Sequence, residues 1–178
     1  MRIDTEFGKV ELVDEPMYTF GSMDNARTYQ FSKNLAAEGL PTSIHGVLLN
    51  NEPIAVFGES GGCSAIHSHS AIFVNGHIFL AVGNSVACMR LSPFEFKWAK
   101  QVDSATCFGI YYQPQHQALI SHGELEITRL SRDGDIQWSA SGADIFSEGV
   151  SLLADFLEAT DFNGNVYHFD YEHGRSSP

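Results

Sequence analysis

Basic side chains are scarce in this sequence. Its 178 residues include 10 lysines and arginines against 22 aspartates and glutamates, which gives a formal net charge of −12. Nucleic acids and anionic membrane surfaces are bound through clusters of Lys and Arg. The composition therefore excludes an extended nucleic-acid patch and disfavours an anionic membrane, so we expect neither as a partner.

Cysteines and long apolar runs are also scarce. Cys63, Cys88 and Cys107 are widely spaced and form no Cys-x-x-Cys pair. The first residues lack the apolar run of a signal peptide, and no stretch approaches the roughly 20 residues of a membrane-spanning helix. We therefore expect a cytosolic protein whose thiols are reduced and buried as small apolar side chains.

Nucleotide-binding motifs are missing, and the one catalytic pattern present is weak. Gly58-Glu59-Ser60-Gly61-Gly62 has the letters of Gly-x-Ser-x-Gly, but no strand–turn–helix is expected around it. The glycine-rich run 59–64 matches neither the phosphate-cradling nor the dinucleotide pattern. No lysine occurs between Lys33 and Lys97, which weakens a phosphate site further. We interpret this run as a connecting loop, and we expect no enzyme activity and no cofactor.

What the chain does contain is enough apolar mass for one domain over residues 1–178. Hydrophobic residues make up 43%, with 13 Phe, 6 Tyr and 2 Trp, which is sufficient for a core. Residues 1–43 are expected to hold N-terminal strands and one helix near 24–38, because Ser22 or Asp24 can cap its start and Gly39 with Pro41 can end it. Residues 44–172 have β texture, and 173–178 form a tail.

Three dipeptides mark tight hairpins in the β region: Asn75-Gly76, Asp133-Gly134 and Asn163-Gly164. Both residue types tolerate the positive φ that a two-residue hairpin turn requires. Between these and other turn signals we predict strands at 44–49, 54–57, 71–74, 77–82, 86–91, 95–102, 106–112, 118–121, 125–130, 136–139, 152–154, 157–162 and 166–171. The fold class predicted is mainly β, built from antiparallel hairpin repeats.

These hairpins recur with a period. The tripeptide Arg-Leu-Ser at 90–92 returns at 129–131, and a tryptophan follows each copy, Trp98 and Trp138. Repeats of about 40 residues with several strands each are typical of propeller blades. Residues 70–171 resemble the blades of quinoprotein-type and tryptophan-aspartate propellers in texture, which implies propeller-like packing with both tryptophans in the core. A two-sheet sandwich fits the length equally well.

Two histidines suggest an alternative chemistry. On a strand, His67 and His69 would share a face and could hold one metal ion together. Gly61 lies six positions before His67, so this stretch resembles the first cupin motif, although the carboxylate expected shortly afterwards is missing. The alternative is a metal-dependent enzyme or small-ligand binder, and an exposed loop is the competing interpretation. His122 and Glu124 could act as acid and base, but no nucleophile accompanies them.

The remaining feature is acidity near the C-terminus. Half of all acidic residues lie between 120 and 172, where only Arg129 and Arg132 oppose eleven carboxylates. A negative surface can steer and hold a basic partner, and ordinary solubility is the competing explanation. We select six carboxylates as the partner contacts: Asp133, Asp135, Asp144, Glu148, Asp155 and Glu158.

Two runs in this acidic region carry a further resemblance. The run from His122 to Phe146 and the run from Asp161 to Asp170 resemble segments of small bacterial proteins without assigned activity. The size, the acidity and the lack of catalytic equipment also resemble bacterial immunity proteins. That resemblance implies a cytoplasmic, non-enzymatic protein that occludes the active surface of a basic toxin domain, often a nuclease. A propeller-like protein-interaction module is the further alternative.

Overall fold

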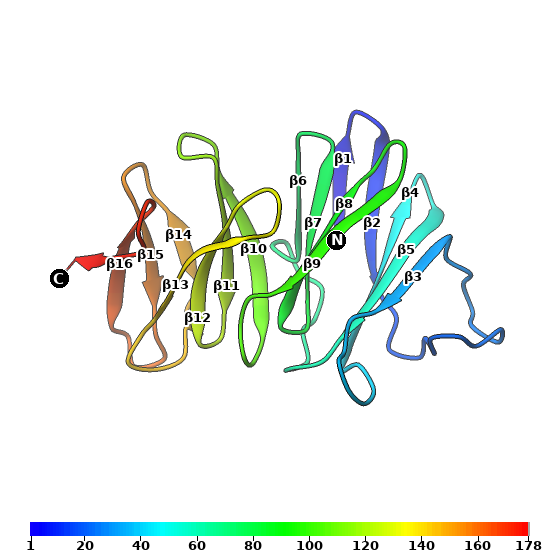
Figure 1. The fold of residues 1–178 in the computed structure, drawn as a ribbon, viewed down its shortest axis with the longest axis horizontal. Helices are drawn as coiled ribbons and strands as arrows, with labels where there is room; N and C mark the ends of the chain where they lie inside the picture. The colour runs from blue at the N-terminus through cyan, green and yellow to red at the C-terminus, as the bar shows by residue number, and fades with distance from the viewer. Residues whose placement is uncertain (178) are drawn as a thin grey trace.

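The computed structural model describes residues 1–177, whose strands form four sheets (Figure 1). We call them blades A to D in chain order. Blade A has the strand order β1-β2-β4-β5-β3, and blades B, C and D contain β6–β9, β10–β13 and β14–β17, each with consecutive strands as neighbours. Successive antiparallel meanders of four strands are the construction of a propeller, so the propeller-like prediction is confirmed and the two-sheet sandwich was wrong.

The strand bounds follow the turns of the sequence closely. Blade A comprises β1 (Arg2–Thr5), β2 (Gly8–Asp14), β3 (Phe31–Asn34), β4 (Ser43–Leu49) and β5 (Glu52–Glu59). Blade B comprises β6 (Ala71–Val74), β7 (His77–Val82), β8 (Ser85–Arg90) and β9 (Glu95–Gln101). Blade C comprises β10 (Cys107–Gln113), β11 (Ala118–Gly123), β12 (Glu126–Leu130) and β13 (Ile136–Ser141). Blade D comprises β14 (Val150–Leu152), β15 (Phe156–Thr160), β16 (Val166–Asp170) and β17 (Ser176–Ser177).

The predicted helix near residues 24–38 was wrong. Residues 31–34 form β3, which pairs in parallel with β5, and the rest of the segment is irregular. The reason is tertiary: the Phe31 ring packs against Phe57, Phe94 and Phe96 at centroid distances of 5.3–5.8 Å. A strand on the open edge of β5 places this ring in the core, and burial of an aromatic ring outweighs a weak helical propensity. Within residues 1–177 no helix is long and apolar enough to cross a membrane.

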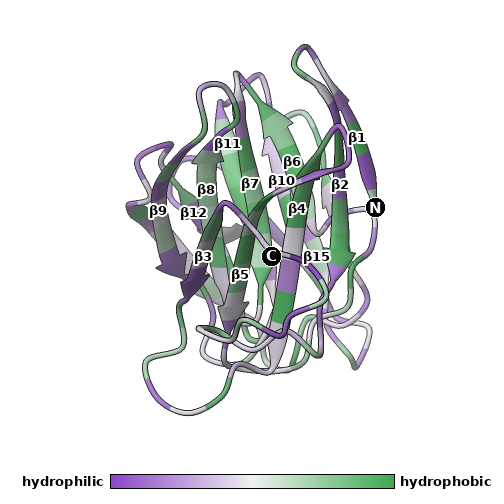
Figure 2. Ribbon diagram, turned by 90° about the vertical axis from the view of Figure 1, so that its right-hand side faces the viewer, coloured by the Kyte–Doolittle hydropathy of each residue, from purple (hydrophilic) through white to green (hydrophobic). Residues whose placement is uncertain are grey.

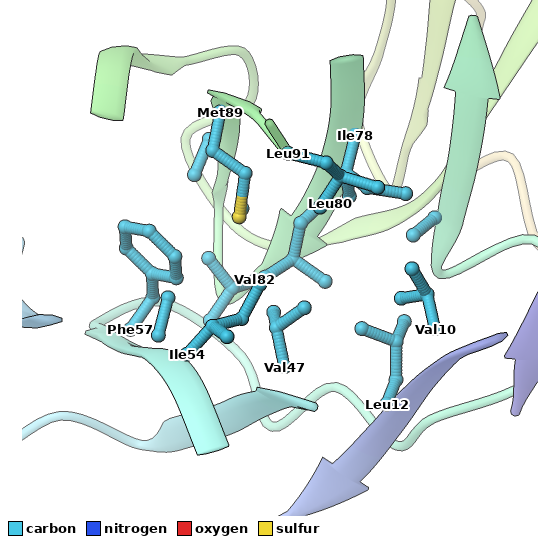
Figure 3. Packing of buried hydrophobic residues seen from close by; sticks show 13 residues of the cluster. Val10, Leu12, Val47, Ile54, Phe57, Ile78, Leu80, Val82, Met89 and Leu91 are labelled. Carbon is cyan, nitrogen blue, oxygen red and sulfur yellow. The ribbon is translucent and has the colours of Figure 1, made fainter. Parts of the chain in front are cut away.

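The core consists of layers between neighbouring blades. In Figure 3, side chains from blade A, such as Leu12 and Phe57, face Leu80 and Met89 from blade B. A second layer joins blades B and C, and a third joins C and D. Among the cysteines, Cys88 and Cys107 are buried as predicted, whereas Cys63 is exposed.

The array is open, because blades A and D lie at opposite ends of the long axis (Figure 1). The outer face of blade A is covered by the segment 15–30, whose Tyr18, Phe20 and Tyr29 pack on it. On the outer face of blade D, Glu158 and His168 are paired on adjacent strands, and His168 Nε2 lies 3.0 Å from Glu158 Oε2.

Each tryptophan joins its blade to the next. Trp98 in β9 donates its indole N–H to the carbonyl of Arg132 at 2.8 Å, and Trp138 in β13 donates to the carbonyl of Tyr171 at 2.9 Å. Both acceptors lie in the last turn of the following blade. A glycine of that turn lies against the indole ring, since a Cβ built on Gly134 or Gly174 would come within 2.6 or 2.5 Å of it. Both tryptophans were predicted to lie in the core: Trp138 is buried there, and Trp98 is partly buried against the layer between blades B and C.

The repeat register differs from the tripeptide match. Trp98 lies opposite Cys88, and Trp138 lies opposite Arg129. The structural equivalent of Arg129 is therefore Cys88 and not Arg90. The two Arg-Leu-Ser copies are offset by two positions within their blades, although the tryptophans are equivalent.

Candidate functional sites

The two histidines of the metal hypothesis do not lie on a strand. His67 and His69 belong to the linker between β5 and β6, and both ring nitrogens of His67 are occupied. Its Nε2 bonds the carbonyl of Phe108 at 2.6 Å, and its Nδ1 accepts the backbone N–H of His69 at 3.2 Å. His69 stacks on Tyr111 at 4.6 Å. These rings fasten the linker to blade C, and within residues 1–177 no three His, Cys, Asp or Glu side chains are arranged to hold a metal ion.

His122 is a structural residue as well. It is buried, and its Nε2 bonds the carbonyl of Phe146 at 2.8 Å. Burial lowers the pKa of its imidazole, against the raising effect of that carbonyl. Within the described chain the His122 ring forms no hydrogen bond or ion pair with Glu124, so the acid–base pair suggested by the sequence is not formed.

A pocket of about 240 Å³ lies between blades B and C beside Trp98. Lys97 and Arg132 line it, but both already have partners: Lys97 contacts Glu95 at 3.0 Å, and Arg132 donates to the Tyr112 hydroxyl at 3.2 Å. Burial raises the pKa of the Cys88 thiol in its wall to about 12, so this sulfur is not a nucleophile at neutral pH. The cations of this pocket therefore already have partners, its thiol is unreactive, and we assign it no chemistry.

The six predicted contact carboxylates are divided among three places. Asp133 and Asp135 are exposed in the β12–β13 turn, and Asp155 is exposed in the β14–β15 turn, both at the upper edge in Figure 1. Asp144 and Glu148 lie in the loop after β13, at the lower edge. Glu158 is on the outer face of blade D. The structure thus brings three of them to one edge and separates the others.

Two other carboxylates of this region serve the fold. Asp161 is fully buried and accepts hydrogen bonds from the backbone of Asn163, from the backbone and side chain of Asn165 and from the Tyr167 hydroxyl, at 2.8–3.0 Å. Burial raises the pKa of its carboxyl, but these four donors lower it more. Asp170 accepts the backbone N–H groups of His173 and Arg175 in the next turn. Neither is free to meet a partner.

Sequence reasoning missed the outer edge of blade C. The strand β13 pairs only with β12 in the described chain, so its other edge leaves alternate backbone N–H and C=O groups unpaired. Grooves of about 530 and 470 Å³ run beside it and share Ser104 and Glu126 in their walls. The signal was the absence of any charged residue in the segment 136–141, which follows two aspartates.

The edge of β9 differs in this respect. It carries Glu95, Lys97 and Lys100, and it is largely hydrophilic in Figure 2, whereas β7, two strands further into the same sheet, is hydrophobic. Charged side chains on an edge strand discourage pairing with another chain. Of these two outer edges, only the β13 edge lacks that protection.

No protein-family model matches the chain, and no curated protein matches it. Several solved structures are similar in fold. BamB from Moraxella catarrhalis is 12% identical with a TM-score of 0.54, covering 85% of this chain and 50% of its own. The WD40 β-propeller domain of Doa1 is 13% identical with a TM-score of 0.50, covering 69% and 42%. A europium-containing methanol dehydrogenase is 15% identical with a TM-score of 0.50, covering 60% and 23%.

The chain therefore spans half or less of the length of each of these proteins. At such low identity the likeness shows the fold alone, and one fold can carry unrelated functions. The comparisons place this chain among structures with propeller-like blades, consistent with its four successive sheets.

Proposed function

We propose that the protein is a non-enzymatic binding module whose propeller-like array holds a basic partner protein. The observation that carries this proposal is the charge of blades C and D: eleven carboxylates and two arginines lie between residues 120 and 172, and of these carboxylates only Asp161 is buried. Arg129 turns toward the blade C–D junction, where its guanidinium donates to the carbonyls of Tyr171 and His116. The exposed charge of these blades is therefore strongly negative, which favours a cationic surface.

The proposal specifies the charge of the partner but not its identity. An immunity protein that occludes a basic toxin domain would be one special case, but neither a family model nor a curated relative supports it. The metal-dependent alternative lacks support because the ring nitrogens of His67 hold the backbone. A propeller-like interaction module fits both the fold and the charge.

The test is reconstitution with a purified partner. The chain is immobilised, a protein captured from its source cells is identified and purified, and the dissociation constant is measured by calorimetry at low and high salt. We expect a stoichiometric complex that weakens at least about tenfold between 50 and 500 mM salt, because exposed charges are screened. Failure to reconstitute any complex, or affinity indifferent to salt, overturns the proposal.

A pair of variants separates blade C from general acidity. Neutralising Asp133 and Asp135 together to Asn should weaken the complex about threefold to tenfold, as rim charges do. The matched control neutralises Glu6 and Glu52 to Gln, which are exposed carboxylates of blade A at the same edge of the array. An equal effect of both pairs would mean that only net charge matters.

A further inference from the structure

The edge of β13 has the properties of a site for strand addition. Its six residues, Ile136 to Ser141, contain no charge and no proline, and four of them are exposed. No backbone or side-chain group within residues 1–177 bonds to its outer edge. An edge of this kind is a template for an extended segment, whose main chain supplies affinity while alternate side chains enter flanking grooves.

The grooves specify where those side chains would go. One lies on the blade B side, between β9 and β13, and includes Ile136 and Ser139 in its wall. The other continues past the end of the strand along Ser141 to Ile145. The two grooves share Ser104 and Glu126 in their walls, and we refer to them together as the channel beside the strand.

The charges around the strand specify the chemistry of the occupant. Asp133 and Asp135 precede β13, Asp144 follows it, and Glu126 lies opposite Ser141 on β12. The basic groups nearby are Lys100, which lines the groove, and Arg132, which is held by Tyr112. A neighbouring segment therefore meets carboxylates at both ends of the strand.

We infer that β13 is the docking edge for an extended, lysine- or arginine-rich segment of a partner protein, which adds as a fifth strand to blade C. The inference rests on the proposed function and names the surface and the partner chemistry. Main-chain pairing holds the segment, and the carboxylates of the channel select its basic side chains.

The test uses defined peptides with the full chain. The probe is an acetylated, amidated heptapeptide of alternating valine and lysine at millimolar concentration, followed by backbone amide exchange. We expect exchange of the outward-facing amides within residues 136–141 to slow at least about tenfold, because paired edge amides are protected, with no change in 95–101 of β9. The same peptide with every amide N-methylated, and an analogue with glutamate for lysine, should protect none of these amides.

A variant pair provides a second measurement. Gln137→Lys places a charge on the edge and should weaken binding of the lysine peptide about tenfold. Ser151→Lys adds the same charge to an exposed strand position of blade D and should leave binding unchanged. Absence of protection, protection at β9 instead, or equal protection by the N-methylated or acidic peptide overturns the inference. If a purified partner still binds while these peptide results are negative, the strand-addition inference fails and the binding-module proposal stands.

Discussion

The contact between Gly174 and Trp138 gives the sharpest prediction about the array. Gly174 has a φ of +65°, and a Cβ there would lie 2.5 Å from two atoms of the indole ring. Gly174→Ala therefore combines backbone strain of about 1–2 kcal/mol with overpacking of about 1–3 kcal/mol. The expected loss in the free energy of unfolding is about 2–5 kcal/mol.

Gly164 supplies the matched control, because its φ is +80° and no atom lies within 4 Å of the Cβ that an alanine would add. Gly164→Ala should cost only the strain of about 1–2 kcal/mol. Both variants are measured by equilibrium urea unfolding followed by circular dichroism. In a Trp138→Leu background the excess cost of Gly174→Ala should disappear, since coupled residues are not additive. Equal costs for the two glycine variants in the native background would refute the role assigned to the indole contact.

Three further predictions concern buried groups. The pKa of His122 lies below its ordinary value of 6.5, so the unfolded chain takes up a proton first. The free energy of unfolding should therefore fall as pH decreases through about 6.5 toward the folded pKa. Urea unfolding at pH 7.5 and 5.5 measures this fall, which should be smaller in His122→Gln than in the native chain. Asp161→Ala should lower the free energy of unfolding by at least about 2 kcal/mol, because it leaves buried donors unpaired; a loss below about 0.5 kcal/mol would contradict the hydrogen bonding described. With native protein and iodoacetamide, Cys63 should react while Cys88 and Cys107 stay protected, since burial raises the pKa of both thiols to about 12; mass spectrometry showing three modified thiols would contradict this burial.

Local signals in the sequence specified most of the strands. Asn75 and Gly76 both adopt positive φ, at 49° and 79°, and the strands on either side have the predicted bounds. A turn of this type depends on two adjacent residues, so the sequence is sufficient to locate it. The tryptophan repeat likewise depends on a contact that recurs, once between blades B and C and once between blades C and D.

Features that depend on distant residues were not predictable in the same way. Phe31 lies in a strand because Phe57, Phe94 and Phe96 are there to receive it, and nothing between residues 24 and 38 encodes those partners. Asp161 and Asp133 both belong to the acidic region between residues 120 and 172. Asp161 is nevertheless a buried hydrogen-bond acceptor, whereas Asp133 is an exposed charge. The uncharged segment 136–141 is visible in the sequence, but only the structure shows that it forms an open sheet edge.

The most direct test of a binding module on blades C and D is an amide-exchange footprint of its purified partner on the full chain. We predict that protection is concentrated in residues 133–144, and that it is lost in high salt together with the complex. A footprint confined to blade A or to the linker at 60–70, or one unchanged by salt, would contradict the account.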